Sequence, residues 1–157
     1  GEGTAYFAWT SAGVPMKAPK PSSNGIALKR TWSGRDGKPL AEGAPLSRGD
    51  RITATLTMTP STALSDLVVV DMLPGGMEIE NLRLTGEGTS QDQGGIRAEL
   101  RDDRLILFVD FLTKPVEYKY VIRAVSRGTF TLPPLAAEGM YAPDISAVGT
   151  PGTVEIN

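Results

Sequence analysis

The sequence has no histidine and no cysteine, so only carboxylate, hydroxyl, amide and basic side chains are available for chemistry. Ser-His-Asp nucleophiles, thiol nucleophiles, and histidine or cysteine metal sites are therefore excluded within this chain. The adjacent acids Asp102 and Asp103 could act as an acid and a base, or bind a divalent cation. Neighbouring strand residues point to opposite faces, however, and an arginine stands on either side of the pair, which favours a charged hairpin turn.

Two further acids, Asp71 and Asp110, lie within apolar stretches that are expected to be strands. Partial burial there would call for an arginine or lysine partner, and a structural ion pair is far more common than catalysis in that setting. The glycine pairs at 75–76 and 94–95 lack the strand-to-helix context of a phosphate loop, so we interpret them as turns. With no histidine base and no converging carboxylates, we predict that the chain is not an enzyme and binds no cofactor or metal ion.

The two tryptophans, Trp9 and Trp32, could form a platform for a sugar ring, as aromatic side chains do in carbohydrate-binding sandwiches. Each stands inside an apolar stretch, so packing in the hydrophobic core is the favoured interpretation. The aromatic residues are scattered, no basic stripe accompanies them, and the net charge is -2. We therefore expect no binding to nucleic acid.

The main candidate for recognition is the pair Met140 and Tyr141, which stands in a short segment between Gly139 and Pro143. Residues 139–144 leave no room for strand alternation, and Pro143 prevents continuation as an inner strand. A tyrosine combines an apolar body with a polar tip, which suits an interface. The alternative is that Tyr141 packs back onto the edge of its own domain, and the residues alone leave both interpretations open.

The elements that would position these residues are short strands. Eighteen glycines and twelve prolines interrupt brief apolar stretches over 157 residues, a rhythm typical of an all-β sandwich. Hydrophobic residues make up 40% and charged residues 22%, and no apolar run approaches the roughly 18 residues of a membrane helix. We predict a single domain, residues 1–157, folded as a two-sheet antiparallel β-sandwich of about 8–10 strands.

Period-two alternation of apolar residues with threonines is clearest in residues 51–59. Residues 67–73 form a continuous apolar run, typical of a strand covered on both faces. The alternation in 104–111 places Phe111 on the same face as Leu105, Leu107 and Val109. The other predicted strands are residues 4–10, 26–32, 77–84, 96–101, 117–127, 128–132 and 153–156, with an extended proline-containing connector at 14–23 and a polar loop at 85–95.

Several segments, taken in order, resemble the C-terminal macroglobulin-like domain of bacterial alpha-2-macroglobulins, the tenth such domain in that naming. They are residues 19–25 (PKPSSNG), 36–39 (DGKP), 68–81 (VVVDMLPGGMEIEN), 101–104 (RDDR), 123–125 with 128–130 (RAV, GTF) and 140–144 (MYAPD). The likeness covers nearly the whole chain and implies a macroglobulin-like, immunoglobulin-like sandwich. A start at Gly1-Glu2-Gly3, with no signal peptide, agrees with a fragment of a larger protein.

This resemblance implies a part in a periplasmic protease trap, whose parent is often a lipoprotein anchored to the inner membrane. In such a trap a protease cuts a bait region, and an internal Cys-Gln thioester then captures the protease covalently. The terminal domain performs no chemistry. It packs against the thioester domain, and a loop tyrosine shields the thioester until the bait is cut; Tyr141, with Met140 beside it, occupies that motif position here.

The implied partners are the thioester domain of the same parent chain and, through the parent, target proteases. The fragment itself is expected to be monomeric. Two other interpretations stay open. One is a stand-alone adhesion or carbohydrate-binding sandwich with an exposed aromatic platform, and the other is a docking scaffold for a peptidoglycan synthase, a class A penicillin-binding protein.

Overall fold

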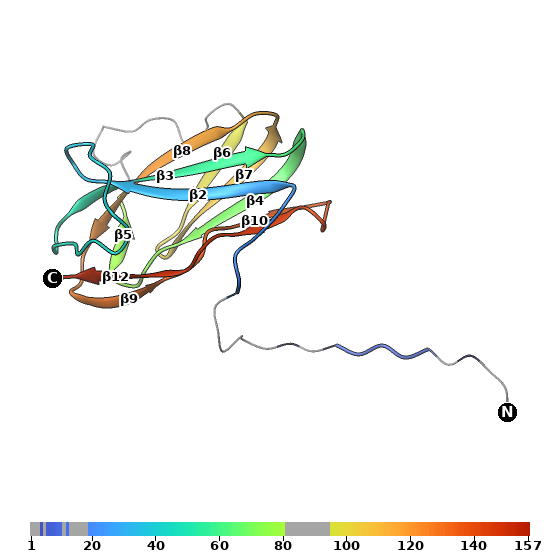
Figure 1. Cartoon of the computed structure of the whole chain (residues 1–157), viewed down its shortest axis with the longest axis horizontal. Helices are drawn as coiled ribbons and strands as arrows, with labels where there is room; N and C mark the ends of the chain where they lie inside the picture. The colour runs from blue at the N-terminus through green and yellow to red at the C-terminus, as the bar shows by residue number, and fades with distance from the viewer. Residues whose placement is uncertain (1–3, 5, 11, 13–18, 81–94) are drawn as a thin grey trace.

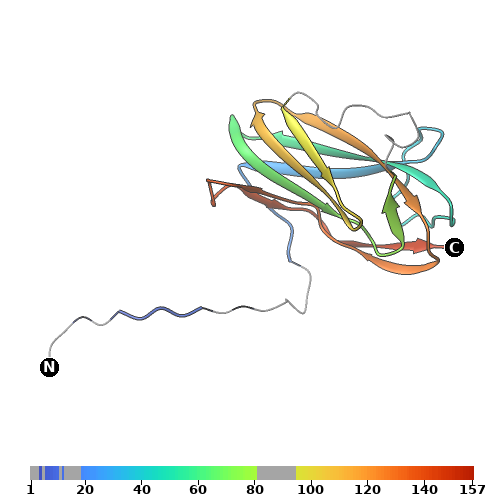
Figure 2. The same cartoon turned by 180° about the vertical axis from the view of Figure 1, so that it is seen from behind.

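The computed structural model describes residues 4, 6–10, 12, 19–80 and 95–157, and these form twelve strands in a layered sandwich (Figure 1). One layer is the six-stranded sheet β1-β11-β10-β4-β7-β6, and the opposite layer is the four-stranded sheet β2-β3-β8-β5. A two-stranded ladder, β12-β9, runs along one side of the sandwich, as the view from behind also shows (Figure 2). The predicted all-β, two-sheet antiparallel sandwich is confirmed.

The strands are β1 (Ser22–Asn24), β2 (Ile26–Ser33), β3 (Arg51–Pro60), β4 (Leu64–Met72), β5 (Met77–Ile79), β6 (Ile96–Leu100), β7 (Arg104–Leu112), β8 (Val116–Ala124), β9 (Gly128–Leu132), β10 (Ala136–Gly139), β11 (Ser146–Val148) and β12 (Gly152–Ile156). Their number exceeds the prediction because β1, β10 and β11 are only three, four and three residues long, too short to show a periodic pattern. No helix in the described part of the chain is long and apolar enough to cross a membrane.

Strands β3 and β8 form the centre of the four-stranded sheet and follow the alternation predicted for them. On β3 the apolar residues are fully buried and the threonines between them are not. On β8, Tyr118, Tyr120 and Ile122 are buried, and Leu56 of β3 stands opposite Tyr118 in the ladder. These side chains point toward the six-stranded sheet, so the core lies between the two layers.

Strand β4 departs from its prediction, because only one of its faces is fully buried. Leu67, Val69 and Asp71 are buried, whereas Val68 and Val70 are partly exposed. The continuous apolar run therefore does not mean that both faces of this strand are covered by the domain.

Phe111 also departs from its prediction, since its side chain is 62% exposed. Buried residues alternate along both strands except at one step. On β7 the next buried residue after Val109 is Leu112, and on β4 the next buried residue after Leu64 is Leu67, so each step is three residues instead of two. These four residues pair across the two strands, so the inward face shifts by one residue in both strands at the same level. The shift coincides with a positive φ of 54° at Asp66 on β4, and it turns the Phe111 side chain outward.

The predicted strand at 4–10 is wrong: its described residues belong to no strand. Tyr6, Phe7 and Trp9 are 93%, 95% and 82% exposed, so the preferred placement of Trp9 in the core is wrong as well. Apolar side chains alone do not make a strand when no neighbouring strand pairs with the backbone. Trp32 does pack against the core, as expected.

The remaining predictions concern ends and turns. The hairpin of β6 and β7 is confirmed, and Asp102 and Asp103 are exposed residues of its turn. Strand β8 ends at Ala124 and β5 at Ile79, both earlier than predicted. Asp110 is exposed rather than partly buried. Residues 14–18 of the connector and 81–94, which include most of the polar loop, lie outside the described residues.

Candidate functional site

Met140 and Tyr141 lie in the tight connection between β10 and β11, which we call the Tyr141 loop (residues 140–145). Their side chains are 50% and 81% exposed. Tyr141 is therefore not packed onto the edge of its own sandwich, and one of the two interpretations that the sequence left open is excluded. Figure 1 shows this loop as a short tip that projects beyond the end of the sheets.

The Tyr141 loop is short and well held. Gly139 N–H donates to the carbonyl of Ile145 over 2.9 Å, and Ile145 N–H donates to the carbonyl of Ala142 over 2.9 Å. The side chain of Asn24 on β1 donates to the carbonyl of Asp144 over 2.5 Å. These bonds tie both sides of the loop to the sheet, so Tyr141 is presented on a fixed base.

Gly139 is required for this geometry. A Cβ atom at position 139 would lie 2.7 Å from the carbonyl oxygen of Ala142 and 3.3 Å from Cβ of Ile145. The first atom is backbone and cannot give way, so any side chain here would displace the loop. The glycine that the sequence places before Met140 thus sets how closely the loop folds back on itself.

Asp66 supports the loop from β4. Its φ is 54°, an uncommon value for a residue other than glycine, although aspartate tolerates it better than most. In this conformation its carbonyl accepts the N–H of Met140 over 2.8 Å. Strained backbone of this kind persists where the surrounding structure enforces it and is common at functional sites.

The same irregularity brings a third apolar side chain to this end of the sheet. Phe111 of β7 follows Asp110 and pairs with Ser65, the residue before Asp66. Met140 is bonded to Asp66 from the other side of β4, since the strand order is β10-β4-β7. We call Phe111, Met140 and Tyr141 the apolar end patch. The sequence did not reveal Phe111 as a member, because regular alternation placed it on the buried face.

A buried charged network lies inside the sandwich. Asp71 of β4 is 1% exposed, forms a salt bridge with Arg30 of β2, and accepts a hydrogen bond from the Tyr120 hydroxyl of β8 over 2.7 Å. Arg30 also donates to the carbonyl of Pro133 over 2.9 Å. This confirms that Asp71 belongs to a structural ion pair and identifies its partner.

Burial raises the pKa of Asp71 above its ordinary value, although the positive charge of Arg30 and the hydrogen bonds from Tyr120 and Arg30 oppose the rise. Burial and the nearby negative charge of Asp71 raise the pKa of Tyr120. Through Arg30 the network joins β2, β4 and β8 to Pro133, which leads into β10 and so to the Tyr141 loop.

The adjacent acids Asp102 and Asp103 belong to a surface hairpin turn and do not converge on one site. The Arg104 side chain donates to Asp103 over 2.9 Å, and this hydrogen bond lowers the pKa of Asp103. Both residues are at the surface, where such a pair contributes little to stability. Over the described ranges, no group of three or more acidic residues is arranged to hold a metal ion.

Comparison with known proteins matches residues 25–144 to the bacterial alpha-2-macroglobulin MG10 domain. The chain is 32% identical to the alpha-2-macroglobulin of Escherichia coli K12, in an alignment that covers 95% of this chain and 10% of the relative. The chain therefore spans about a tenth of the length of the curated relative it matches.

Solved structures agree. A mutant of Salmonella alpha-2-macroglobulin in which one tyrosine is replaced by glycine matches with a TM-score of 0.80 and 33% identity, over 92% of this chain and 10% of that one. Native E. coli alpha-2-macroglobulin from domain MG7 to the C-terminus matches with a TM-score of 0.81 and 32% identity, over 92% of this chain and 25% of that one. The family is non-catalytic, as predicted. The chain belongs to the bacterial alpha-2-macroglobulin MG10 domain family.

Proposed function

We propose that this domain is the interdomain lock of a periplasmic protease trap, and that Tyr141 covers the thioester of the parent chain until a protease cuts the bait region. The observation that carries the proposal is the exposure of Tyr141, at 81%, on a loop whose base is fixed. A side chain of this size, held outward by glycine and backbone hydrogen bonds, is suited to fill a pocket on another domain.

The chemistry of a thioester explains why such a cover is needed. A thioester is an activated acyl group, so water or any small amine that reaches it destroys it. A lid protects it by excluding nucleophiles from an apolar site, and the lid can leave when the domains separate. Met140 stands next to Tyr141 and adapts its shape to an irregular partner, and Phe111 is a further exposed apolar side chain at this end of the sheet.

Relatives support the same proposal. Salmonella alpha-2-macroglobulin has been crystallised after reaction with methylamine, a small amine of the kind from which a thioester must be protected. The E. coli protein has been studied after activation by porcine elastase. By this proposal the parent acts on proteases, carries an internal Cys-Gln thioester, and is anchored at the inner membrane as a lipoprotein. Family membership favours this role over an adhesion or carbohydrate-binding module.

Hydroxyl-radical footprinting of the full-length parent tests the proposal. Tyr141 and Met140 should be oxidised several-fold more slowly in the intact parent than in the isolated chain, because the thioester domain covers them. Cleavage of the bait by elastase should bring their oxidation to the rate seen in the isolated chain. Tyr118, which is 5% exposed, serves as the internal control and should stay protected in every state. Equal oxidation of Tyr141 in the intact parent and in the isolated chain would contradict the proposal.

A further inference from the structure

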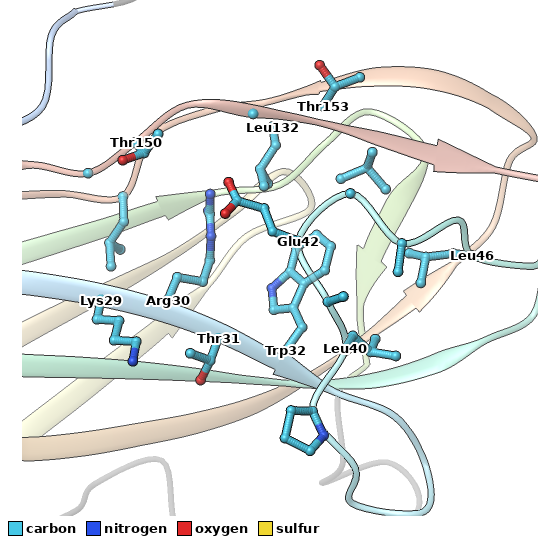
Figure 3. A pocket seen from close by; sticks show the side chains of 18 of the residues that line it. Lys29, Arg30, Thr31, Trp32, Leu40, Glu42, Leu46, Leu132, Thr150 and Thr153 are labelled. Carbon is cyan, nitrogen blue, oxygen red and sulfur yellow. The ribbon is translucent and has the colours of Figure 1, made fainter.

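A groove of about 730 Å³ lies between β2 and β12, and we call it the β2–β12 groove (Figure 3). None of the residues that line it belongs to the Tyr141 loop. Its volume falls within the range of about 300–1,000 Å³ that is usual for ligand sites. Its floor is apolar and includes Leu28, Trp32, Leu40, Leu132, Leu135 and Val154.

One wall of the groove is the free edge of β2. Gly25 and Ser61 continue the register of the β2–β3 ladder, and the Ser61 N–H donates to the carbonyl of Gly25. Because backbone groups alternate in direction along a strand, the odd-numbered residues of β2 are the ones that bond to β3. Even-numbered residues then point their N–H and C=O groups the other way, toward the groove. The Trp32 carbonyl confirms this, since it accepts the N–H of Leu40 rather than a bond from β3.

Two residues of that edge keep both their N–H and their C=O groups unpaired among the described residues. The carbonyl of Ile26 is taken by the Ser23 hydroxyl and that of Trp32 by Leu40. Between them, Leu28 and Arg30 present backbone N–H and C=O groups to the groove, and no partner for these groups is found among the described residues.

The opposite wall is the free edge of β12. Leu46 N–H donates to the carbonyl of Glu155, and Asn157 N–H donates to the carbonyl of Leu46, so the odd-numbered residues of β12 face away from β9. Thr153 is the next such residue and lines the groove. Residues 40–46 bond to β2 through Leu40 and to β12 through Leu46, so their backbone occupies one end of the groove.

The indole of Trp32 supplies a further unused donor. Its Nε1 is buried and has no hydrogen-bond partner within the part of the chain that the structure describes. Figure 3 shows this side chain among the residues that line the groove, between Arg30 and Leu40. A buried donor without an acceptor is unfavourable, so a small rotation of the indole that brings Nε1 to the carbonyl oxygen of a molecule bound in the groove would be favoured.

We propose that the β2–β12 groove binds an extended, apolar peptide segment as an added β-strand. Its backbone would bond to Leu28 and Arg30 on one side and to Thr153 on the other, and one of its carbonyl groups would accept the Trp32 indole N–H. Every second side chain of the segment would enter the apolar floor. Unused strand edges select an extended peptide over other apolar ligands, because only a peptide backbone offers donors and acceptors at the spacing of a strand.

Nuclear magnetic resonance of the full chain carrying Trp9→Phe tests this proposal, because one indole N–H resonance, that of Trp32, then remains. The probe is a seven-residue peptide of alternating valine and threonine with a lysine at each end. It should shift the indole resonance downfield in a saturable way. The same peptide with its central valine replaced by proline, which breaks strand pairing, should bind about tenfold more weakly or not at all.

A matched pair of variants tests the edge of β12. Thr153→Pro removes an N–H that faces the groove and should weaken binding by about tenfold. Thr131→Pro makes the same change at the residue directly opposite in the ladder, on β9, where the N–H faces away from the groove, and should leave binding unchanged. The peptide comparison needs no change at these sites, so it stands even if a variant fails to fold.

Three outcomes would overturn the proposal. The first is no saturable shift at millimolar peptide. The second is equal binding of the proline-containing peptide, which would mean a general apolar pocket. The third is a shift that depends on protein concentration without peptide, which would mean that a second copy occupies the groove.

Discussion

Replacing Tyr141 with glycine in the full-length parent should raise the rate of thioester loss to methylamine before bait cleavage by about 10–100-fold. A central interface residue of this kind contributes about 2 kcal/mol, and each 1.4 kcal/mol corresponds to a factor of about ten in rate. Tyr141 is 81% exposed on its own domain, so the change should not unfold the domain and should act on the interface alone. The measurement is the release of a free thiol over time.

Tyr141→Phe is the matched control. It keeps the apolar ring and removes only the hydroxyl, so it should remain within a few-fold of the unaltered parent if exclusion of water and amines is the mechanism. Thiol release that is no faster in Tyr141→Gly would contradict the lock. A parent that releases no thiol with methylamine at all would contradict it too, since there would be no thioester to cover.

Replacing Asp71 with alanine should lower the free energy of unfolding of the 157-residue chain by about 3–5 kcal/mol at pH 7. The change leaves the guanidinium of Arg30 without its buried partner and the Tyr120 hydroxyl without its acceptor. For a chain of this size the midpoint of thermal unfolding should fall by about 10 °C. Urea denaturation followed by tryptophan fluorescence gives the free energy.

The control for this variant is Asp110→Ala, which removes an exposed aspartate from the adjacent strand β7. It should change the free energy of unfolding by no more than about 0.5 kcal/mol. A loss of less than about 1 kcal/mol in Asp71→Ala would show that the network is not a structural ion pair of the expected strength.

The pH dependence of the same variant tests the direction of the pKa shift. Because burial raises the pKa of Asp71 in the folded chain above the ordinary value of 3.8, the folded state binds the proton more readily than the unfolded state. The contribution of Asp71 to stability is then fully present below the unfolded pKa and decreases as pH rises through the folded pKa. The gap in stability between the unaltered chain and Asp71→Ala should therefore widen from pH 7 to pH 4. A narrowing gap would mean that Arg30 outweighs burial.

Much of the fold follows from local pattern. The apolar and threonine alternation of β3 and the tyrosine face of β8 were predicted correctly, because both strands are central in a sheet with one face buried. Tyr141 could be singled out for a local reason too: Gly139 and Pro143 bracket a segment too short to be an inner strand.

What the sequence did not reveal depends on contacts between distant segments. Phe111 is turned outward at the level of a backbone irregularity at Asp66, which lies on a different strand. The residues around Phe111 in the sequence therefore do not indicate its exposure. Asp71 was expected to have a basic partner, but only the packing of β2 against β4 identifies Arg30. The predicted burial of Trp9 was wrong because its neighbours have the composition of a strand, and composition does not supply a pairing partner.

The β2–β12 groove has the same origin. Its walls come from opposite ends of the chain, and the unused backbone groups of Leu28 and Thr153 become visible only when the direction of each ladder bond is known. Apolar residues in edge strands are ordinary in sequence, so nothing local distinguishes a strand edge that is free from one that is covered.

The most direct test of the lock is to identify what touches Tyr141 in the intact parent. With Tyr141 replaced by the photoreactive amino acid p-benzoylphenylalanine, irradiation should cross-link position 141 to the peptide that carries the thioester cysteine and glutamine. Mass spectrometry would identify the peptide, and bait cleavage before irradiation should abolish the product. A cross-link to any other region, or an equal yield after bait cleavage, would contradict the central claim that Tyr141 covers the thioester.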